Sequence, residues 1–452
     1  MHNSALWKAL SAVLLCVLLI QLFSIRSWTE FPERIFQHPP PPSPSTELSP
    51  TDDKEVETEL DVEPSPEPKV EAWSYEWERD RYNHGLSEEQ CDIAFPELYN
   101  EIDRAVDYWK DKKITPQSID LVDGNDGGVR VLIHDQQLRI ISTRGLFRKD
   151  FRQRIIAVLQ QLLRAITAAE SANEPIPDVE MTIIVDDKPV LDPAKSSPLW
   201  AFTRAYANAK HDDLWLTPDF HFWANPPENE GFRQMQERAR KHDGPLSKKI
   251  PKVAWRGVSW TNPDIRKPLL EVTEGKKWAD VVEMNWDVPQ DILPMDGFCR
   301  YRYVVNTEGR SWSARMTHLL NCDSLLFVHD VEWIAHYYHL LDTDMNCVRV
   351  ERDFSDLEEK VKYFSNHTQE AQIIANTAKI TFRERYTTPA ATACYWRKLL
   401  RSWATVSFTP ATKVVVKGKN KQTTERLRGV SFEEFIVHDN TKDYPYKVEK
   451  HP

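Results

Sequence analysis

The chain lacks several patterns that mark common classes of protein. Its six cysteines and 14 histidines form no C-x-x-C pair and no histidine-rich cluster, so no metal site is expected. Basic residues are not in excess, because the net charge is −11, and this argues against a nucleic-acid-binding protein. No internal repeat is visible, so a repeat architecture is not expected either.

The acidic excess is concentrated in one stretch. Residues 51–80 hold 12 acidic and three basic residues, a net charge of −9, and the remainder of the chain is close to neutral. Residues 31–70 also contain ten of the 30 prolines. A segment so poor in aromatic residues cannot build a core, and its prolines favour extended conformations. Residues 26–80 are therefore expected to form a disordered, semi-rigid stem.

A long apolar run lies before this stem. Residues 9–25 carry no charge over 17 positions, which is the lower limit for a helix that spans a bilayer. A cleaved signal peptide is the alternative, but no small-residue cleavage site follows. The pattern favours a signal anchor, with residues 1–8 in the cytosol. The final KHP is not a retrieval signal, which favours the Golgi membrane over the endoplasmic reticulum.

Alternating helices and strands are expected from residue 90 onward, which predicts an α/β fold. An apolar stripe at helical spacing predicts a helix over residues 147–169, and VEMTIIV predicts a buried strand over 179–185. Asp186 and Asp187 follow at the carboxyl end of that strand, where α/β folds place their chemistry. The body divides into two α/β segments and an extension: residues 90–240, 250–405 and 406–452.

A short turn near the middle of the body has the features of a phosphate site. Residues 301–306 and 325–328 predict two strands, with a helix between them that begins after the turn. In such a strand–helix–strand unit, the first turn and the start of the helix bind phosphate groups. The turn offers a close backbone approach, two hydroxyls and a planar guanidinium, from Gly309, Ser311, Ser313 and Arg315. The alternative is a capped helix with a surface arginine.

Another predicted strand, residues 253–255, ends at Arg256 and Gly257. An arginine at this place can bind phosphate, or it can form a structural ion pair.

Five of the six cysteines lie in the body, and Cys16 lies in the apolar run. Cys299 and Cys322 flank the central turn and can clip it by a disulfide, whereas Cys347 is expected to stand outside the disulfides. The single N-x-S/T glycosylation acceptor begins at Asn366.

With these pieces in place, the body resembles the capsule-associated-protein family, glycosyltransferase family 90, over roughly residues 90–405. The most specific stretch is CRYRYVVNTEGRSWSARMTHLLNCDSLLF. It reproduces the family's order of a strand, G-x-S-x-S-x-R, a helix and a Cys-x-Ser strand. DVEWIAHYYHLL, ERDFSDLEEKV and CYWRKLL also match. The family includes protein O-glucosyltransferases and fungal xylosyltransferases.

The resemblance implies two Rossmann-like domains in a GT-B arrangement and inversion at the anomeric carbon without a metal. It implies a UDP-sugar as donor substrate, no other cofactor, and a glycan or glycoprotein acceptor. By position, Asp187 matches the catalytic base. The positions that match or adjoin donor-binding residues are Arg256, Gly257, Gly309, Ser311, Ser313, Arg315 and Glu332. Two disulfides are also implied, Cys299–Cys322 and Cys91–Cys394.

Three questions stay open in the sequence. The donor sugar is xylose or glucose, because nothing locates the pocket that distinguishes them. Adjacent residues of a strand point to opposite faces, so only one of Asp186 and Asp187 is expected to face the cleft, and the resemblance favours Asp187. The expected function is a membrane-anchored, lumenal glycosyltransferase, and the alternative is an inactive relative that binds glycans in the secretory pathway.

Overall fold

The structure is a computed structural model. It describes residues 73–191, 195–226, 230–343, 345–417, 423–438 and 442–445. These described residues belong to one compact unit, which contains both predicted α/β segments. The predicted cytosolic tail, the apolar run and most of the predicted stem lie outside the described residues.

The prediction of a Golgi membrane protein is wrong. In the described part of the chain, no helix is both long enough and apolar enough to cross a bilayer. The predicted anchor, residues 9–25, lies outside the described residues. The apolar run has 17 residues, at the lower limit for a spanning helix, so its length gave the prediction little support.

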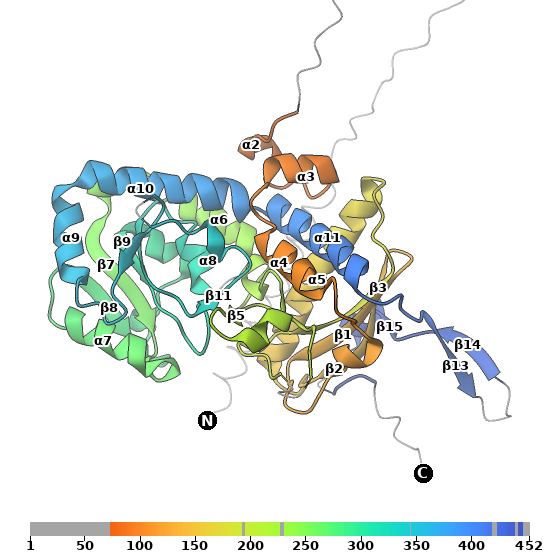
Figure 1. The fold of residues 1–452 in the computed structure, drawn as a ribbon. Coiled ribbons are helices and arrows are strands. Elements are labelled where there is room, and N and C mark those ends of the chain that lie inside the picture. Colours follow the sequence, from red (N-terminus) through yellow and green to blue (C-terminus); the bar gives the residue numbers. More distant parts are fainter. Residues whose placement is uncertain are drawn as a thin grey trace, which may run out of the picture. The chain divides into compact units, whose positions relative to one another are not determined.

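Two sheets form the core, and the first is mixed (Figure 1). β1 is antiparallel to both β2 and β3, whereas β3, β4 and β6 run parallel. The hairpin of β1 and β2 turns at Asp135 and Gln136, which both have the positive φ that a type I′ turn requires. The strands in spatial order are β15 (Val430–Ser431), β2 (Gln137–Arg144), β1 (Gly128–His134), β3 (Val179–Ile184), β4 (Trp200–Ala201) and β6 (Trp215–Leu216).

The second sheet is fully parallel, which confirms the predicted α/β class. It contains the predicted strand–helix–strand unit, β9–α8–β10, in which α8 (Arg315–Leu319) has only five residues. The strands in spatial order are β12 (Val348–Val350), β10 (Leu325–His329), β9 (Tyr301–Asn306), β7 (Ile250–Gly257) and β8 (Ala279–Glu283).

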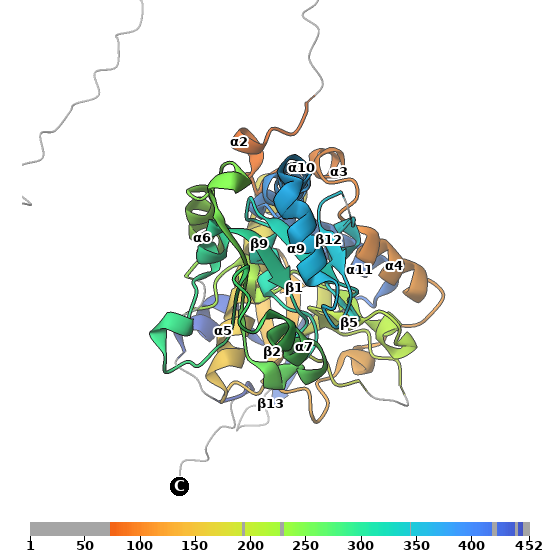
Figure 2. The same ribbon diagram turned by 90° about the vertical axis from the view of Figure 1, so that its left-hand side faces the viewer.

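Helices pack against both sheets (Figures 1 and 2). The other helices are α2 (Trp77–Asp80), α3 (Glu88–Ala94), α4 (Asn100–Trp109), α5 (Lys149–Ser171), α6 (Phe232–Arg240), α7 (Pro263–Thr273), α9 (Leu357–Asn366), α10 (Thr368–Thr381), α11 (Pro389–Val406) and α12 (Phe432–Val437). Two small sheets pair β5 (Arg204–Ala205) with β11 (Trp333–Ile334), and β13 (Lys413–Lys417) with β14 (Thr423–Leu427).

The chain returns to the first sheet after it completes the second. α11 packs against α4 and α5, as Figure 1 shows, although it belongs to the predicted C-terminal segment 250–405. Its tryptophans carry this packing. Trp396 donates to the side chain of Gln161 at 3.2 Å, and Trp403 donates to the carbonyl of Glu180 at 3.0 Å. The first sheet is therefore covered by helices from both ends of the body.

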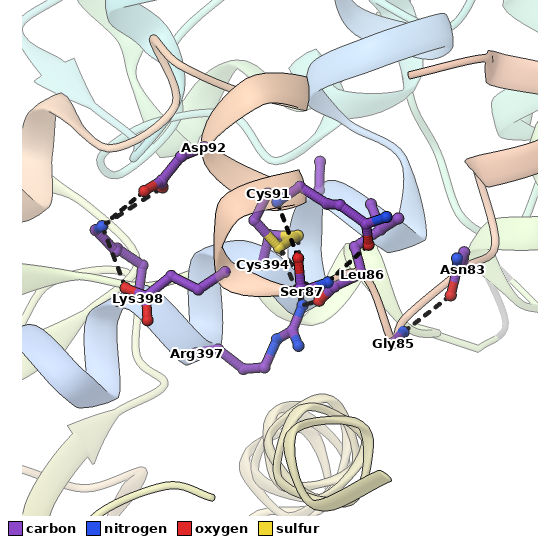
Figure 3. The surroundings of a disulfide bond; sticks show 12 residues. Asn83, Gly85, Leu86, Ser87, Cys91, Asp92, Cys394, Arg397 and Lys398 are labelled. Carbon is purple, nitrogen blue, oxygen red and sulfur yellow. Dashed lines mark hydrogen bonds and ion pairs between the residues drawn. A yellow bond between two sulfur atoms is a disulfide. The ribbon is translucent and has the colours of Figure 1, made fainter. Parts of the chain in front are cut away.

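Two disulfides are present, with the pairing that the resemblance implied. Cys91 of α3 is joined to Cys394 of α11 (Figure 3), and Cys299 is joined to Cys322. Arg397 extends beside the first disulfide and donates to the carbonyl of Leu86. Cys347 is buried and belongs to neither disulfide.

Candidate active site

The turn that follows β9 is closely packed. A Cβ atom on Gly309 would lie only 3.1 Å from Nη2 of Arg266, so a side chain here would crowd that guanidinium. Asn262 donates from Nδ2 to the carbonyl of Gly309 at 3.1 Å. The sequence predicted that the following helix would supply N–H groups and a dipole to a phosphate. α8 is too short for a strong dipole, so arginines must supply most of the positive charge.

Ser311 joins this turn to the predicted catalytic acid. Its hydroxyl donates to the main-chain carbonyl of Asp187 at 2.7 Å, and Ser311 is fully buried. Ser313 is also buried, two residues further along the turn. The turn of the second sheet and the end of β3 in the first sheet are thus in direct contact.

Asp186 and Asp187 lie beyond the last residue of β3, Ile184. Nη1 of Arg154, on α5, lies 2.9 Å from Oδ1 of Asp187. Nη1 of Arg310, in the turn, lies 3.8 Å from Oδ2 of Asp187 and 3.4 Å from Oδ1 of Asp186. Both carboxylates therefore approach the same guanidinium. The expectation that they point to opposite faces is wrong, because residues alternate only within a strand and this strand has already ended.

Three arginines, Arg256, Arg266 and Arg315, line one cavity of about 270 Å³. We call it the arginine cavity. Gly257, the last residue of β7, also lines it. Most of the remaining lining is apolar and comes from one segment, with Met284, Trp286, Ile292, Leu293, Pro294, Met295 and Phe298. The cavity therefore combines a strongly cationic part with an apolar part.

Arg315 is the least compensated of the three arginines. Its Nε and Nη1 atoms are buried and have no hydrogen-bond partner in the described part of the chain. Burial, and then the like charges of Arg266 and Arg256, lower the pKa of Arg315 to about 9. A buried cation without a counter-charge destabilises a fold, so its presence points to a ligand that supplies the negative charge.

Arg256 combines a structural ion pair with a place in the cavity. Its Nη2 lies 2.8 Å from Oδ1 of Asp280, and its Nη1 donates to the carbonyls of Trp255 and Asp280. Its Nε is buried and has no partner among the described residues. A Cβ atom on Gly257 would lie 2.6 Å from the ring of Trp255, so close packing fixes this corner of the cavity. The sequence left open whether Arg256 forms a structural ion pair. Arg256 does form one, with Asp280, and it also lines the arginine cavity.

Arg266 was not among the predicted residues. Its Nε donates to the carbonyl of Glu308 at 2.9 Å, and its Nη1 donates to the carbonyl of Val258 at 2.8 Å. Burial lowers its pKa to about 10. Arg266 lies on the buried face of α7 together with Leu269 and Thr273. A charged residue within an apolar stripe was the signal that could have identified it.

Glu332 does not direct its carboxylate into a buried site. Its side chain is 68% exposed and pairs with Arg352 at 2.9 Å. The buried acid is Glu308, directly before the turn, which accepts the N–H groups of Glu332 at 2.8 Å and Trp333 at 2.7 Å. Burial raises the pKa of Glu308. An acid between a buried strand and Gly309 was a signal that sequence reasoning did not use.

Asn366 is exposed at the end of α9, so the predicted acceptor is on the surface. Among the described residues, no group of three or more His, Cys, Asp and Glu side chains is arranged to hold a metal ion.

The sequence matches the family described as "Glycosyl transferase family 90" over residues 87–429, which is more than half of its 452 residues. The chain belongs to glycosyl transferase family 90. The matched range includes Asp187, the turn and all three arginines of the arginine cavity.

Curated relatives with similar sequences carry glucosyltransferase names. "Protein O-glucosyltransferase 1" of Homo sapiens is 26% identical over 253 residues, which is 51% of this chain and 63% of that protein. "Protein O-glucosyltransferase 2" of Danio rerio is 26% identical, over 52% of this chain and 49% of that protein. The "O-glucosyltransferase rumi homolog" of Aedes aegypti is 27% identical, over 50% of this chain and 61% of that protein. The chain thus spans less than two thirds of the length of these relatives.

One solved structure, "Anabaena Alr3699/HepE in complex with UDP and glucose", aligns with a TM-score of 0.27 and 10% sequence identity. The alignment covers 51% of this chain and 73% of that chain. A TM-score this low does not establish a shared fold.

Proposed function

We propose that this chain transfers a glucosyl or xylosyl unit from a UDP-sugar to a hydroxyl group of a glycan or a protein. The arginine cavity carries the proposal. Its three guanidinium groups suit the diphosphate, and its apolar lining around Trp286 suits the flat face of a nucleobase. Family membership supports a transferase, and the names of the relatives support glucose as one of the two donor sugars.

The proposed reaction is a single inverting displacement. The acceptor oxygen forms a bond to the anomeric carbon as the bond to the diphosphate oxygen breaks. Asp187 takes the proton of the acceptor hydroxyl, and UDP leaves with an added negative charge. Arg315 and Arg256 stabilise that charge, as groups placed in advance at the departing oxygen can do in a site with little water. In this proposal the charge needs no metal ion.

The two sheets suit the two halves of a GT-B arrangement. In this arrangement the second sheet holds the donor at the ends of β7 and β9, and the first sheet presents the base beyond β3. The hydrogen bond between Ser311 and Asp187 joins the two halves at the point where the reaction is proposed.

One observation favours an inactive, glycan-binding relative as the second candidate. Arg154 binds Asp187 at 2.9 Å, and Arg310 lies 3.8 Å from it. The two arginines occupy the carboxylate oxygens that a base has to offer to the acceptor hydroxyl.

The test is a panel of UDP-glucose, UDP-xylose, UDP-galactose and UDP-N-acetylglucosamine on the full chain, with release of UDP as the readout. UDP affinity is measured in parallel by calorimetry. We expect UDP to bind and one of the first two donors to be turned over fastest. Binding of UDP without turnover of any donor would support the inactive relative. Absence of UDP binding would overturn both the donor assignment and the proposed reaction.

A further inference from the structure

A second cavity, of about 390 Å³, lies between parts of α5 and α6. This volume is within the range of about 300–1,000 Å³ that is usual for ligand pockets. It is lined by four aromatic residues and two arginines: Tyr82, Phe222, Trp223, Phe232, Arg164 and Arg233. We call it the aromatic cavity. None of these residues takes part in the reaction proposed above.

The aromatic cavity includes an exposed positive charge, Arg164, that has no acidic partner among the described residues. Arg164 lies with its guanidinium 4.3 Å from the ring centre of Trp223, and it makes no hydrogen bond or ion pair among the described residues. The acid among the described lining residues, Glu230, is paired with Arg238 at 2.9 Å. Arg233 has an acidic partner, Glu237, at 3.1 Å. Arg164 is therefore the cation that an incoming anion can pair with.

His84 also lines the aromatic cavity. Burial, and then the charges of Arg164, Arg397 and Arg233, lower the pKa of His84 to about 4, so it is neutral near pH 7. Its Nε2 atom is buried and has no partner in the described part of the chain. The lining thus includes a neutral imidazole and the amide of Gln234, two hydrogen-bonding groups that suit hydroxyls.

The aromatic cavity is connected to the proposed site by two elements. On α5, Arg154 contacts Asp187 and Arg164 follows ten residues later, about 15 Å further along the helix axis. The short helix η3 (Phe220–Phe222) packs along α5, where Gln161 donates to the carbonyl of Asp219 at 2.9 Å. α5 therefore runs from the proposed base to the cavity.

The second connection runs through α6. Phe232 and Arg233, its first residues, line the aromatic cavity. Arg238, further along α6, pairs with Asp296 at 3.0 Å. Asp296 belongs to the helix η7 (Met295–Arg300), which also contributes Met295 and Phe298 to the arginine cavity. The aromatic cavity thus adjoins the elements that hold both the proposed donor and the proposed base.

We propose that the aromatic cavity is an acceptor subsite for a glycan that carries a carboxylated sugar, a hexuronate. The carboxylate pairs with Arg164, the sugar's C–H face packs on the aromatic rings, and its hydroxyls meet His84 and Gln234. The spacing places this sugar more than one ring away from the hydroxyl that reacts at Asp187. The assignment of this cavity as an acceptor subsite rests on the proposed transfer reaction. Binding of a hexuronate in the cavity does not depend on that reaction.

The test uses two probes, methyl glucuronide and methyl glucoside. They differ only at one position, where the glucuronide has a carboxylate and the glucoside has a hydroxymethyl group. Saturation-transfer NMR titrations measure their binding to the full chain and to Arg164→Gln. Lys110→Gln is the matched control, because it removes the same charge from an exposed position directly after α4. We expect the glucuronide to bind about tenfold or more tightly than the glucoside, as one charge-assisted hydrogen bond allows. This preference should disappear in Arg164→Gln and persist in Lys110→Gln.

UDP affinity, measured on each variant, separates this proposal from the previous one. It should be unchanged in Arg164→Gln, and UDP should not displace the glucuronide. Equal binding of the two probes, a preference that survives Arg164→Gln, displacement by UDP, or tighter binding of an acidic peptide than of the glucuronide would each overturn the subsite. If Arg164→Gln fails to fold, Arg233→Gln takes its place, and a partial loss of the preference is then the supporting result. Failure of the wild-type chain to bind UDP would concern the proposed transfer alone.

Discussion

Ser311 donates its hydroxyl hydrogen to the main-chain carbonyl of Asp187 at 2.7 Å, across 124 positions of sequence. The bond fixes the carbonyl of the proposed base to the turn that leads to Arg315. A base and a group that stabilises the leaving charge act together only if their separation is held constant. This contact gives a structural reason for the first serine of the G-x-S-x-S-x-R pattern, because Ser311 connects the two sheets.

Asp187→Asn should stop proton transfer while keeping the shape of the site. We expect turnover to fall roughly 100-fold or more, with UDP affinity unchanged. Initial rates and calorimetry measure the two effects. Asp186→Asn is the matched control, because it removes the same charge beside the same Arg310. An inactive Asp186→Asn with a nearly normal Asp187→Asn would reassign the base to Asp186, and two nearly normal variants would place the base elsewhere.

Arg315→Gln should weaken UDP binding and at the same time not destabilise the protein. The guanidinium has two buried nitrogens without partners among the described residues, and two like charges act on it, so its removal relieves an unfavourable interaction in the unliganded state. We expect UDP affinity to fall about tenfold or more and the melting temperature without ligand to stay equal or rise. Lys110→Gln, which loses an exposed pair with Asp107 far from the arginine cavity, is the control. A lower melting temperature with unchanged UDP affinity would assign Arg315 a structural role.

Glu308 and Glu332 should differ in their contribution to stability. Glu308→Ala removes a buried carboxylate that accepts two main-chain N–H groups and leaves both without that acceptor, so a loss of about 1–3 kcal/mol in the free energy of unfolding is expected. Glu332→Gln alters a side chain that is 68% exposed, and a change within about 0.5 kcal/mol is expected. Urea unfolding measures both. If Glu332→Gln alone reduces UDP affinity, the result would support the predicted contact between Glu332 and the donor.

Stability should increase with pH above about 8 because of Lys249. This lysine is 8% exposed, and burial lowers its pKa from 10.5 to about 8. Between the folded and unfolded pKa values, the unfolded chain binds more protons, so the free energy of unfolding rises with pH. The slope is at most about 1.4 kcal/mol per pH unit.

Lys249→Met should remove this rise. Unfolding in urea at several pH values between 7.5 and 9.5 compares the two proteins, which share every other titrating group. Equal slopes in the wild type and the variant would show that Lys249 keeps an ordinary pKa in the folded state.

The sheets were the most predictable part of the fold. The run at 301–306 predicted a strand, and β9 spans Tyr301–Asn306; the run at 179–185 predicted β3, Val179–Ile184. Continuous apolar runs and long amphipathic stripes are local signals, and α5 was predicted by the same reasoning. Such local signals carry no information about contacts between segments that are distant in the sequence.

Residues 333–341 show this limit. Their apolar spacing predicts an amphipathic helix, but the structure has the strand β11 and the short helix η8 (Tyr338–Leu340). The N–H of Trp333 is taken by the carboxylate of Glu308, and the strand pairs with β5. These partners are 25 or more positions away in the chain, so tertiary pairing overrides the local pattern.

The residues of the candidate site likewise differ in how far the sequence could predict them. Residue type and position identified Arg256, Ser311 and Arg315, which the structure places around one turn and one cavity. Arg266 was missed, because its role depends on α7 packing onto that turn. The prediction that Asp186 and Asp187 point to opposite faces was wrong. It assumed that β3 continues through both residues, whereas β3 ends at Ile184. The catalytic roles of these residues remain predictions.

The bond between Cys91 and Cys394 turns most of the body into a covalent ring, with 303 positions between its two cysteines. A single proteolytic cut anywhere inside that ring leaves one molecule of unchanged mass apart from an added water, and only a reductant separates the pieces. The original ends of the chain are then two tails on the ring. New ends can therefore be opened in an exposed loop, between Cys91 and Cys394, while the halves of the protein stay tethered.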